Sequence, residues 1–339
     1  MKSLFRGLAG LAMGAAMVAA PLAVTAQEAV DSGMTIYFQL GGNPGDSATL
    51  ARELGARDAA RILKVNLMEQ HAGWDPQKML VQANEALAAA PDAIVVMGHP
   101  GTDAMTSFIN KAKEAGIVVV VNNNALPGTS MSYFGLDNYG AGKNLANLTI
   151  EKGGLKEGDK VVVYGAFIEG APGNDVAKGT VEVLSEKKIA FDELQWSNEA
   201  VADPSLSVPV LVAYLEANPD TKAIIVPGHS GITAVLGKVL ADAGKQPGEV
   251  VASGFDISAG AIQGLKDGYI TVVLDQQPYL QGFMPVVAAV LEKKCGLAGL
   301  NLNPGGGSVT KDNVEALEAL VKPASGNVFT SPFGGEVGA

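Results

Sequence analysis

Short apolar runs rich in β-branched residues alternate with amphipathic stretches from Met34 almost to the end of the chain. Such runs are typical of strands buried on both faces, and the stretches between them have the periodicity of helices. We expect strands at residues 35–40, 63–68, 93–97, 117–121, 133–136, 160–164, 191–196, 223–226, 250–253 and 270–274. We expect helices at residues 46–60, 76–89, 103–115, 140–151, 175–187, 205–217, 231–243 and 259–266.

Alternating strands and helices of this kind form parallel sheets that carry helices on both faces. Ten strands are too many for one comfortable doubly wound sheet, so the pattern predicts an α/β protein with two lobes. The length of 339 residues also suits two domains of about 150 residues each. In such sheets a ligand lies beyond the carboxyl ends of the strands, so the residues directly after each strand are the candidates for a site.

The first 26 residues have the organisation of a signal peptide. Lys2 and Arg6 precede an uncharged apolar stretch at residues 8–24, and small residues lead up to Ala26. The stretch is short for a membrane span, so we favour cleavage after Ala26 over an uncleaved anchor and expect an exported protein that begins at Gln27. No later stretch of the sequence is long and apolar enough to span a bilayer.

The chain is acidic, with 24 Lys and Arg residues against 35 Asp and Glu residues and a net charge of −11. Removal of the leader, which carries two positive charges and no negative ones, changes the net charge from −11 to −13. Such a charge argues against nucleic acid and anionic membranes as partners. Cys295 is the single cysteine of the sequence, so no internal disulfide can form.

The loop from Gly41 to Asp46 invites comparison with phosphate-binding loops, because its glycines follow a predicted strand and precede a predicted helix. The glycines do not have the G-x-G-x-x-G spacing, and no lysine follows them as in a P-loop. Asp46 stands where an anion would bind, and we expect it to cap the helix instead. The loop is therefore predicted to lie against a neutral group, with the amide of Asn43 available to it.

The sequence carries no motif that demands catalysis or metal binding. The tripeptide His229-Ser230-Gly231 lacks the G-x-S-x-G spacing of a nucleophile elbow, and we expect Ser230 to cap the helix that follows. His71, His99 and His229 lie far apart, without the spacing of a zinc site. We therefore predict that the protein is not an enzyme and that it needs no metal and no cofactor.

Six segments occur in an order and spacing that mark a known family. They are GGNPGDS, PDAIVVMGHPGTDAM, AKEAGIVVVVNNN, FGLDNYGAG, VASGFDIS and KDGYITVVLDQQPYLQG. From about Met34 to Val321 the chain resembles the periplasmic sugar-binding proteins of ABC importers, specifically the ribose-binding type. The resemblance implies two Rossmann-like lobes, each a parallel sheet with helices on both faces, joined by three hinge crossings near Asp137–Asn138, Gln276–Gln277 and Asn303–Pro304.

The resemblance also implies how the chain is divided and how it works. After a signal peptide at 1–26, the N-terminal lobe is expected to comprise 27–137 and 278–303, the C-terminal lobe 138–277 and 304–325, and a tail 326–339. The lobes are expected to close on a ligand by hinge motion, with Asp137, Asn138 and Gln277 as hinge residues. The protein is expected to be a periplasmic monomer that delivers its ligand to an ABC permease in the inner membrane.

A set of residues that follow the predicted strands is expected to line the cleft between the lobes: Asn43, Trp74, His99, Asn123, Asn124, Phe167, Asn174, Gly228, His229, Asp256 and Gln276. Only Asp256 and Gln276 match the ribose type unchanged. Asn123 and Asn124 replace its Asp-Arg pair, and Asn174 replaces its cleft arginine. Ribose itself is therefore not the expected ligand.

These replacements leave a wall rich in side-chain amides, and each amide offers both donors and an acceptor to a hydroxyl group. Asp256 can accept two further hydrogen bonds. Lysine and arginine do not follow the predicted strands, which argues against phosphorylated sugars and sugar acids. We therefore expect a neutral polyhydroxylated ligand, either a monosaccharide, a sugar alcohol or a small furanosyl signal.

Alternatives stay open for single residues and for the function. Trp74 either stacks on a ligand or packs within its loop, whereas Phe167 is favoured for the cleft and Trp196 for the core. A sensory binding protein that presents its closed form to a membrane receptor would have the same sequence features, and a secreted carbohydrate-active enzyme is a further alternative. A transcriptional regulator would need a basic helix-turn-helix before Met34, where this chain has a leader.

Overall fold

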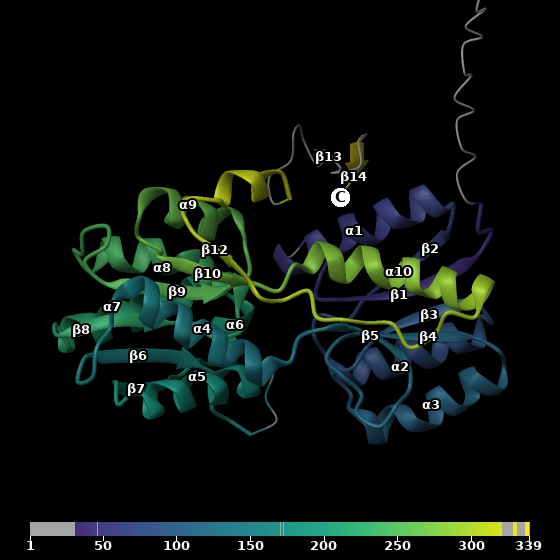
Figure 1. Cartoon of the computed structure of the whole chain (residues 1–339), viewed down its shortest axis with the longest axis horizontal. Coiled ribbons are helices and arrows are strands. Elements are labelled where there is room, and N and C mark those ends of the chain that lie inside the picture. The colour runs from purple at the N-terminus through teal and green to yellow at the C-terminus, as the bar shows by residue number, and fades with distance from the viewer. Residues whose placement is uncertain are drawn as a thin grey trace, which may run out of the picture.

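The computed structural model describes residues 31–45, 47–169, 171, 173–320, 328–330 and 336–338. The expected leader, the expected helix cap Asp46 and most of the expected tail lie outside the described residues. Within the described part of the chain, no helix is both long enough and apolar enough to cross a membrane. The ribbon forms two lobes that lie side by side, each around one sheet (Figure 1).

The first lobe is built around a six-stranded parallel sheet. Its strands are β1 (Thr35–Gly41), β2 (Asn66–His71), β3 (Ala93–Met97), β4 (Val118–Asn123), β5 (Ser132–Gly135) and β11 (Asn301–Leu302). Their order across the sheet is β11-β5-β4-β3-β1-β2. The helices of this lobe are α1 (Ser47–Leu63), α2 (Pro76–Ala88), α3 (Thr102–Glu114) and α10 (Pro278–Cys295).

The two faces of the first sheet pack against different helix pairs, because successive side chains of a strand point to opposite faces. Phe38 and Val95 pack with α1 and α10. Ile94 and Val96 pack on the other face, with α2 and α3. Figure 1 shows the first pair above the sheet and the second pair below it. The sheet is thus buried on both faces.

The second lobe repeats this plan. Its strands are β6 (Lys160–Gly165), β7 (Ala190–Gln195), β8 (Thr221–Ile225), β9 (Val251–Phe255), β10 (Val272–Asp275) and β12 (Gly307–Val309). Their order is β12-β10-β9-β8-β6-β7, and β12 alone among them runs antiparallel to its neighbour. The principal helices are α4 (Asn138–Gly153), α5 (Asn174–Glu186), α7 (Ser207–Ala217), α8 (Ser230–Asp242) and α9 (Ala259–Asp267). Val161 and Ile225 pack with α4 and α5, whereas Val162 and Ile224 pack with α7, α8 and α9.

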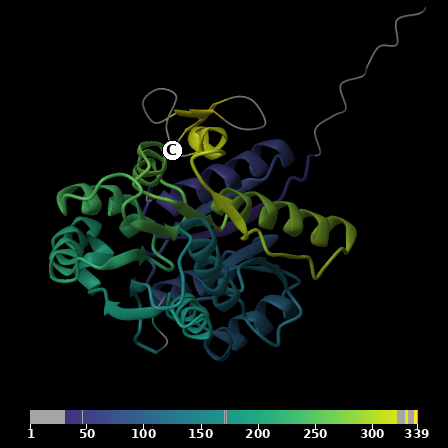
Figure 2. The ribbon, with the colours of Figure 1, turned by 60° about the vertical axis from the view of Figure 1, so that its left-hand side comes forward.

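The chain passes between the two sheets three times. It leaves β5 for α4 through Leu136 and Asp137, and it leaves β10 for α10 through Gln276 and Gln277. The third passage joins β11 to β12 at residues 303–306. Figure 1 shows the chain passing between the lobes, and Figure 2 shows the same ribbon turned so that the second lobe comes forward. The prediction of two α/β lobes joined by three crossings is confirmed.

Several local expectations were wrong. The second strand begins at Asn66 rather than at 63, because α1 continues to Leu63 and the turn to the strand is made at Lys64, which has a φ of 48°. His229, not Ser230, caps α8, since its Nδ1 accepts a hydrogen bond of 3.1 Å from the backbone N–H of Ile232.

The strand pattern also failed to indicate several elements. One is α10, which is apolar over most of its length, and two are the short strands β11 and β12 that complete the sheets. The others are α6 (Asn198–Ala202), η1 (Pro204–Leu206), η2 (Val314–Leu320), β13 (Val328–Thr330) and β14 (Glu336–Gly338). Five of these elements, β11, β12, η1, β13 and β14, have only two or three residues, which are too few for an apolar period to be recognised.

Helices α1 and α10 approach each other at two glycines. A Cβ atom on Gly55 would collide with the carbonyl oxygen of Tyr279, and one on Gly282 would collide with the carbonyl oxygen of Arg52. The absence of a side chain at both positions therefore lets the two backbones come into contact. This close approach brings Arg52 of α1 beside Gln281 of α10, at the edge of the sheet where the strands end.

Candidate ligand-binding site

The predicted residues of the first lobe lie where expected, at the carboxyl ends of its strands. Asn43 follows β1, Trp74 follows β2, His99 follows β3 and Asn123 ends β4. Asn43 is exposed, and its Oδ1 lies close enough to Gly73 that a Cβ there would come within 3.2 Å. The loops after β1 and β2 are thus packed against each other, which fixes the place of Trp74.

The indole of Trp74 lies over the end of the first sheet. Its ring approaches Gly41 so closely that a Cβ there would come within 2.5 Å of Cζ3, and it packs with Met97 and Met79. Trp74 has a φ of 61°, a conformation that is unfavourable for a bulky residue. The ring therefore takes this position because its surroundings hold it there, and packing and ligand contact are both compatible with the arrangement.

A polar network connects the two lobes through the second crossing. The Oε1 atom of Gln276 accepts two hydrogen bonds. One comes from Nε2 of Gln281 at 2.9 Å and the other from Nδ2 of Asn123 at 3.2 Å. The Nε2 of Gln276 in turn donates to Oδ2 of Asp256 at 2.6 Å, and its backbone N–H donates to Oδ1 at 3.2 Å. Asn123, Gln276 and Asp256, which the sequence placed in one cleft, are thus joined directly.

Gln281 is the centre of this network, although sequence reasoning did not find it. Its side chain is fully buried, and its Oε1 accepts hydrogen bonds from Asn123 Nδ2 at 3.1 Å and from Arg52 Nη2 at 3.0 Å. Its Nε2 donates to both oxygens that Gln276 offers. The amide of Gln281 therefore has all its hydrogen-bonding capacity used within the protein.

Arg52 corrects the expectation that the strand ends carry no cation. It is fully buried, and its Nη1 donates to the carbonyl oxygen of Leu40, at the end of β1, at 2.9 Å. Its guanidinium carbon lies 5.6 Å from the centroid of the Trp74 ring, within the range of a cation–π contact. Arg52 was missed because it comes from α1 and not from a strand end. A signal was present, since position 52 falls on the helix face that also buries Thr49, Ala56 and Ala59.

Charge in the site is balanced between the lobes. Burial lowers the pKa of Arg52 to about 10, against the attraction of Asp256 and Glu53, so the guanidinium stays charged at neutral pH. Burial raises the pKa of Asp256 to about 6, and the hydrogen bonds from Gln276 and the field of Arg52 oppose this rise. Burial and then the Asp256 charge raise the pKa of Asp275 to about 7. The charge of Asp256 thus disfavours ionisation of Asp275, so ionisation of both buried carboxyl groups together is unfavourable.

His99 is held in its neutral form. Burial and, secondarily, the charge of Arg52 lower its pKa to about 4. Its ring centroid lies 5.6 Å from that of Trp74, and its buried Nδ1 has no hydrogen-bond partner among the described residues. Arg52 and His99 thus both contact the Trp74 ring.

The predicted residues of the second lobe gather around the end of β6. Phe167 follows this strand, and its backbone N–H donates to Gln195 Oε1 at 2.6 Å. Asn174, at the start of α5, is buried and donates from Nδ2 to the carbonyl oxygen of Ala166 at 3.0 Å, while its Oδ1 has no partner in the part of the chain that the structure describes. Gly228 has a φ of 86°, and a Cβ there would come within 3.4 Å of Gly173.

His229 has structural contacts on two sides. Besides capping α8, its ring packs edge-on against Trp196, with the centroids 5.5 Å apart. Burial lowers its pKa. Trp196 itself lies in the core of the second lobe. No hydrogen bond between described residues joins His229 to the network around Gln276, and its contact with a ligand stays a prediction.

The expected hinge residues all lie at helix starts on the crossings. Asp137 caps α4, its Oδ1 accepting a hydrogen bond from the backbone N–H of Gly140 at 3.1 Å. Asn138 donates from Nδ2 to Oδ1 of Asn124 at 3.1 Å, which ties the first crossing to the end of β4. Gln277 precedes α10 with a φ of 52°.

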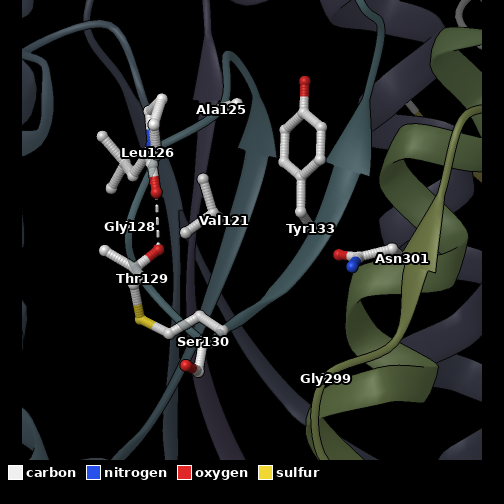
Figure 3. A pocket seen from close by; sticks show the side chains of 11 residues that line it. Val121, Ala125, Leu126, Gly128, Thr129, Ser130, Tyr133, Gly299 and Asn301 are labelled. Carbon is white, nitrogen blue, oxygen red and sulfur yellow. Dashed lines mark hydrogen bonds between the residues drawn. The ribbon is translucent and has the colours of Figure 1, made fainter.

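A pocket of about 390 Å³ lies outside this network. It is lined by the connection after β4, by Tyr133 and by Gly299 and Asn301, as Figure 3 shows. None of the predicted cleft residues lines it. The labelled Thr129 hydroxyl donates to the carbonyl oxygen of Leu126, so it is already used within the loop. Across the described ranges of the chain, no group of three or more His, Cys, Asp or Glu side chains could hold a metal ion.

Two lobes, each with a mainly parallel sheet whose carboxyl ends face a shared polar layer, define a class of hinged α/β binding proteins. Comparison with known proteins agrees, since residues 50–294 match the family model described as periplasmic binding protein domain. This chain belongs to that family.

Individual members of the family and individual solved structures share only limited sequence identity with this chain. The xylose/arabinose-binding protein XylF of Sulfolobus acidocaldarius is 33% identical over 109 residues, which cover 30% of this chain and 27% of that protein. A carbohydrate transporter of Acidothermus cellulolyticus, solved in complex with myo-inositol, has a TM-score of 0.69 at 23% identity, covering 84% of this chain and 96% of its own. A solute-binding protein of Burkholderia graminis, solved with D-arabinose, has a TM-score of 0.69 at 22% identity, covering 85% and 98%. At these identities the two structures establish likeness of fold.

Proposed function

We propose that this protein is the solute-binding component of an ABC importer and that it captures a neutral polyhydroxylated molecule between its lobes. The observation that carries the proposal is the polar network from Asn123 through Gln281 and Gln276 to Asp256. It joins the carboxyl ends of both sheets across a crossing, which is where a hinged α/β protein holds its ligand.

The side chains around the network favour hydroxyl groups. Asn43, Asn124 and Asn174 each provide an amide at a strand end or a helix start beside it, and Asp256 provides a carboxylate. Amides both donate and accept, as hydroxyl groups do, and a buried site of this kind rejects analogues that leave its polar groups unpaired. The relatives named above are described with xylose, arabinose or myo-inositol, all of which are neutral and polyhydroxylated.

The charges of the site support a neutral ligand more than an anionic one. Arg52 is the cation that the network itself contains, and the Asp256 and Asp275 carboxyl groups offset it. A sugar acid or a phosphate would add a negative charge to a layer that already holds two buried carboxyl groups. We therefore assign the site to a monosaccharide or a sugar alcohol.

The remaining assignments follow from this function. The N-terminal lobe comprises residues 27–137 and 278–303 and the C-terminal lobe 138–277 and 304–325, and they close as rigid bodies about Asp137, Asn138 and Gln277. The protein acts in the periplasm as a monomer, after removal of its leader, and passes its ligand to a permease of the inner membrane. It binds and releases this ligand without converting it.

The first test is a thermal-shift screen of the protein against D-arabinose, D-xylose, D-ribose, D-glucose and myo-inositol, with their acids and phosphates alongside. A compound present at a hundred times its Kd stabilises the folded state by about 2.7 kcal/mol, which is a clear shift of Tm. We expect a shift with one neutral compound and none with the charged analogues.

A matched pair of variants then checks the site. Asp256→Asn removes the carboxylate at the second-lobe end of the network and is expected to abolish the shift, whereas Asp312→Asn changes an exposed carboxylate far along the chain and is expected to retain it. A shift only with acids or phosphates, or chemical conversion of the bound compound, would contradict the proposal.

A further inference from the structure

Arg52 has an unusual position for a charged residue. It lies on α1, is fully buried, and belongs to neither the strand ends nor the crossings. Two of its five N–H groups are used by the protein, one by Leu40 and one by Gln281. Its Nε is buried and has no hydrogen-bond partner within the described ranges. An arginine retained only for packing would be expected to satisfy this donor within the protein, because a buried unpaired donor is costly.

A second buried nitrogen without a hydrogen-bond partner among the described residues belongs to His99, whose ring, like the guanidinium of Arg52, lies beside the indole of Trp74. His99 Nδ1 is buried, again without a partner in the described part of the chain, and both the imidazole of His99 and the guanidinium of Arg52 lie 5.6 Å from the centre of the Trp74 ring. Two buried polar atoms therefore flank one indole. Aromatic rings with convergent polar groups are typical of small-molecule sites.

Arg52 is also coupled to the opposite lobe. Its charge lowers the pKa of Asp256, and Asp256 in turn favours the charged form of Arg52. Gln281 and Gln276 connect the two side chains by hydrogen bonds. Arg52, a positively charged donor from the first lobe, and Asp256, a negatively charged acceptor from the second lobe, thus belong to one polar layer.

We propose that Arg52 contacts the ligand and determines specificity: with His99 it holds one oxygen-bearing group of a neutral sugar or polyol beside Trp74, while Asp256 receives a hydroxyl from the other lobe. This inference rests on the proposed function and extends it. It assigns the donor side of the site to α1, an element from which sequence reasoning nominated no residue.

The test measures affinity by titration calorimetry for the full chain and for Arg52→Met and Arg52→Lys, with Arg61→Lys as a control on the same helix. The probes are D-arabinose, D-xylose, D-ribose and myo-inositol, their monodeoxy analogues, and the aldonic acids of the three sugars. Loss of one charged hydrogen bond is expected to weaken binding about 10- to 100-fold in Arg52→Met, with a smaller loss in Arg52→Lys and none in the control.

The deoxy analogues distinguish a contact from a structural role. One of them should bind the wild-type protein about 10-fold or more weaker than its parent but should bind Arg52→Met as well as its parent does, because the partner of the missing hydroxyl is then also gone. If every analogue keeps its wild-type penalty in the Arg52 variants, or if both variants keep affinity within about twofold, the inference is overturned. Should neither Arg52 variant fold, the same comparison is made with His99→Asn, and unchanged discrimination there overturns it as well.

Two further outcomes separate this inference from the function on which it rests. Wild-type protein that binds none of the neutral probes would overturn the proposed function and the role of Arg52 together. Preference for an aldonic acid over its neutral sugar would show that Arg52 pairs with an anion, which would overturn the argument from charge balance while a binding function stands. Neutral binding without an effect at Arg52 would overturn the assignment of Arg52 alone.

Discussion

Ionisation of Asp275 should make the protein less stable as the pH rises, and replacement of this residue by asparagine should remove that loss of stability. The residue ends β10, is 4% exposed, and lies beside Asp256. Backbone N–H groups of Gln277 and Ile257 bond to its carboxyl group, whose Oδ1 has no partner among the residues described. An asparagine side chain at this position would keep an oxygen for those donors and remove the ionisable group, so Asp275→Asn changes charge with little change of shape.

The magnitude follows from the pKa of the carboxyl group. Its ordinary value of 3.8 is raised to about 7 by burial and by Asp256. Below pH 3.8 the group is protonated in both the folded and the unfolded chain, and its contribution to stability is complete. As the pH rises from 3.8 to about 7 only the unfolded chain loses the proton, so the free energy of unfolding falls, by up to about 4 kcal/mol. Asp275→Asn should therefore match the wild type near pH 4 and exceed it by up to about that amount at pH 8.

Urea unfolding followed by tryptophan fluorescence measures this difference, since each lobe contains one described tryptophan, Trp74 and Trp196. Titrations at pH 4.5, 6 and 8 are compared for the wild type, Asp275→Asn and the exposed control Asp312→Asn. The control should follow the wild type at every pH. We argue that ionisation of Asp275, buried beside Asp256, costs stability that its hydrogen bonds do not restore. A stability gain of Asp275→Asn that did not grow with pH, or a variant less stable than the wild type at pH 8, would refute this.

Two other predictions concern packing and protonation. Gly282→Ala places a Cβ against the backbone of α1 at Arg52 and should lower the free energy of unfolding by about 1–3 kcal/mol in the same urea assay, whereas Gly306→Ala, at a position with open space around it, should cost much less. His99 should stay neutral until the pH falls to about 4, which NMR titration of its imidazole would reveal. Because this pKa is lowered in the folded state, the contribution of His99 to stability is present above pH 6.5 and is lost as the pH falls towards 4, and a midpoint near 6.5 would contradict its burial.

The fold could be predicted from the sequence because parallel strands buried on both faces are nearly continuous apolar runs. The run VVVV within β4 is an example, as its length and flanking polar residues leave little ambiguity. The same pattern carries no information about β11, which has two residues and depends on pairing with β5. α10 was missed for a related reason, since a helix that is apolar over most of its surface has a weak periodicity.

The candidate site was predictable only as far as strand ends define it. Asn123, Gln276 and Asp256 come from three different strand ends or crossings, and the topology of the fold brings them together. Arg52 and Gln281 enter the same network from α1 and α10, and their contact requires the close approach of those helices at Gly282. A sequence read element by element does not reveal which two helices touch, so it could not reveal this pair.

The same layer concentrates two kinds of feature that reduce stability. Seven described non-glycine residues have positive φ, and four of them, Trp74, Asn123, Asp256 and Gln277, lie at these strand ends or on the second crossing. Six buried side-chain atoms lack a partner within the described part of the chain, and four of them, in Arg52, His99, Asn174 and Asp275, belong to strand ends or to helices that border them. Strained backbone and unpaired polar groups persist where the surrounding structure enforces them and where they serve a function. Their coincidence at the carboxyl ends of both sheets is an argument for a ligand site there that does not depend on any resemblance between sequences.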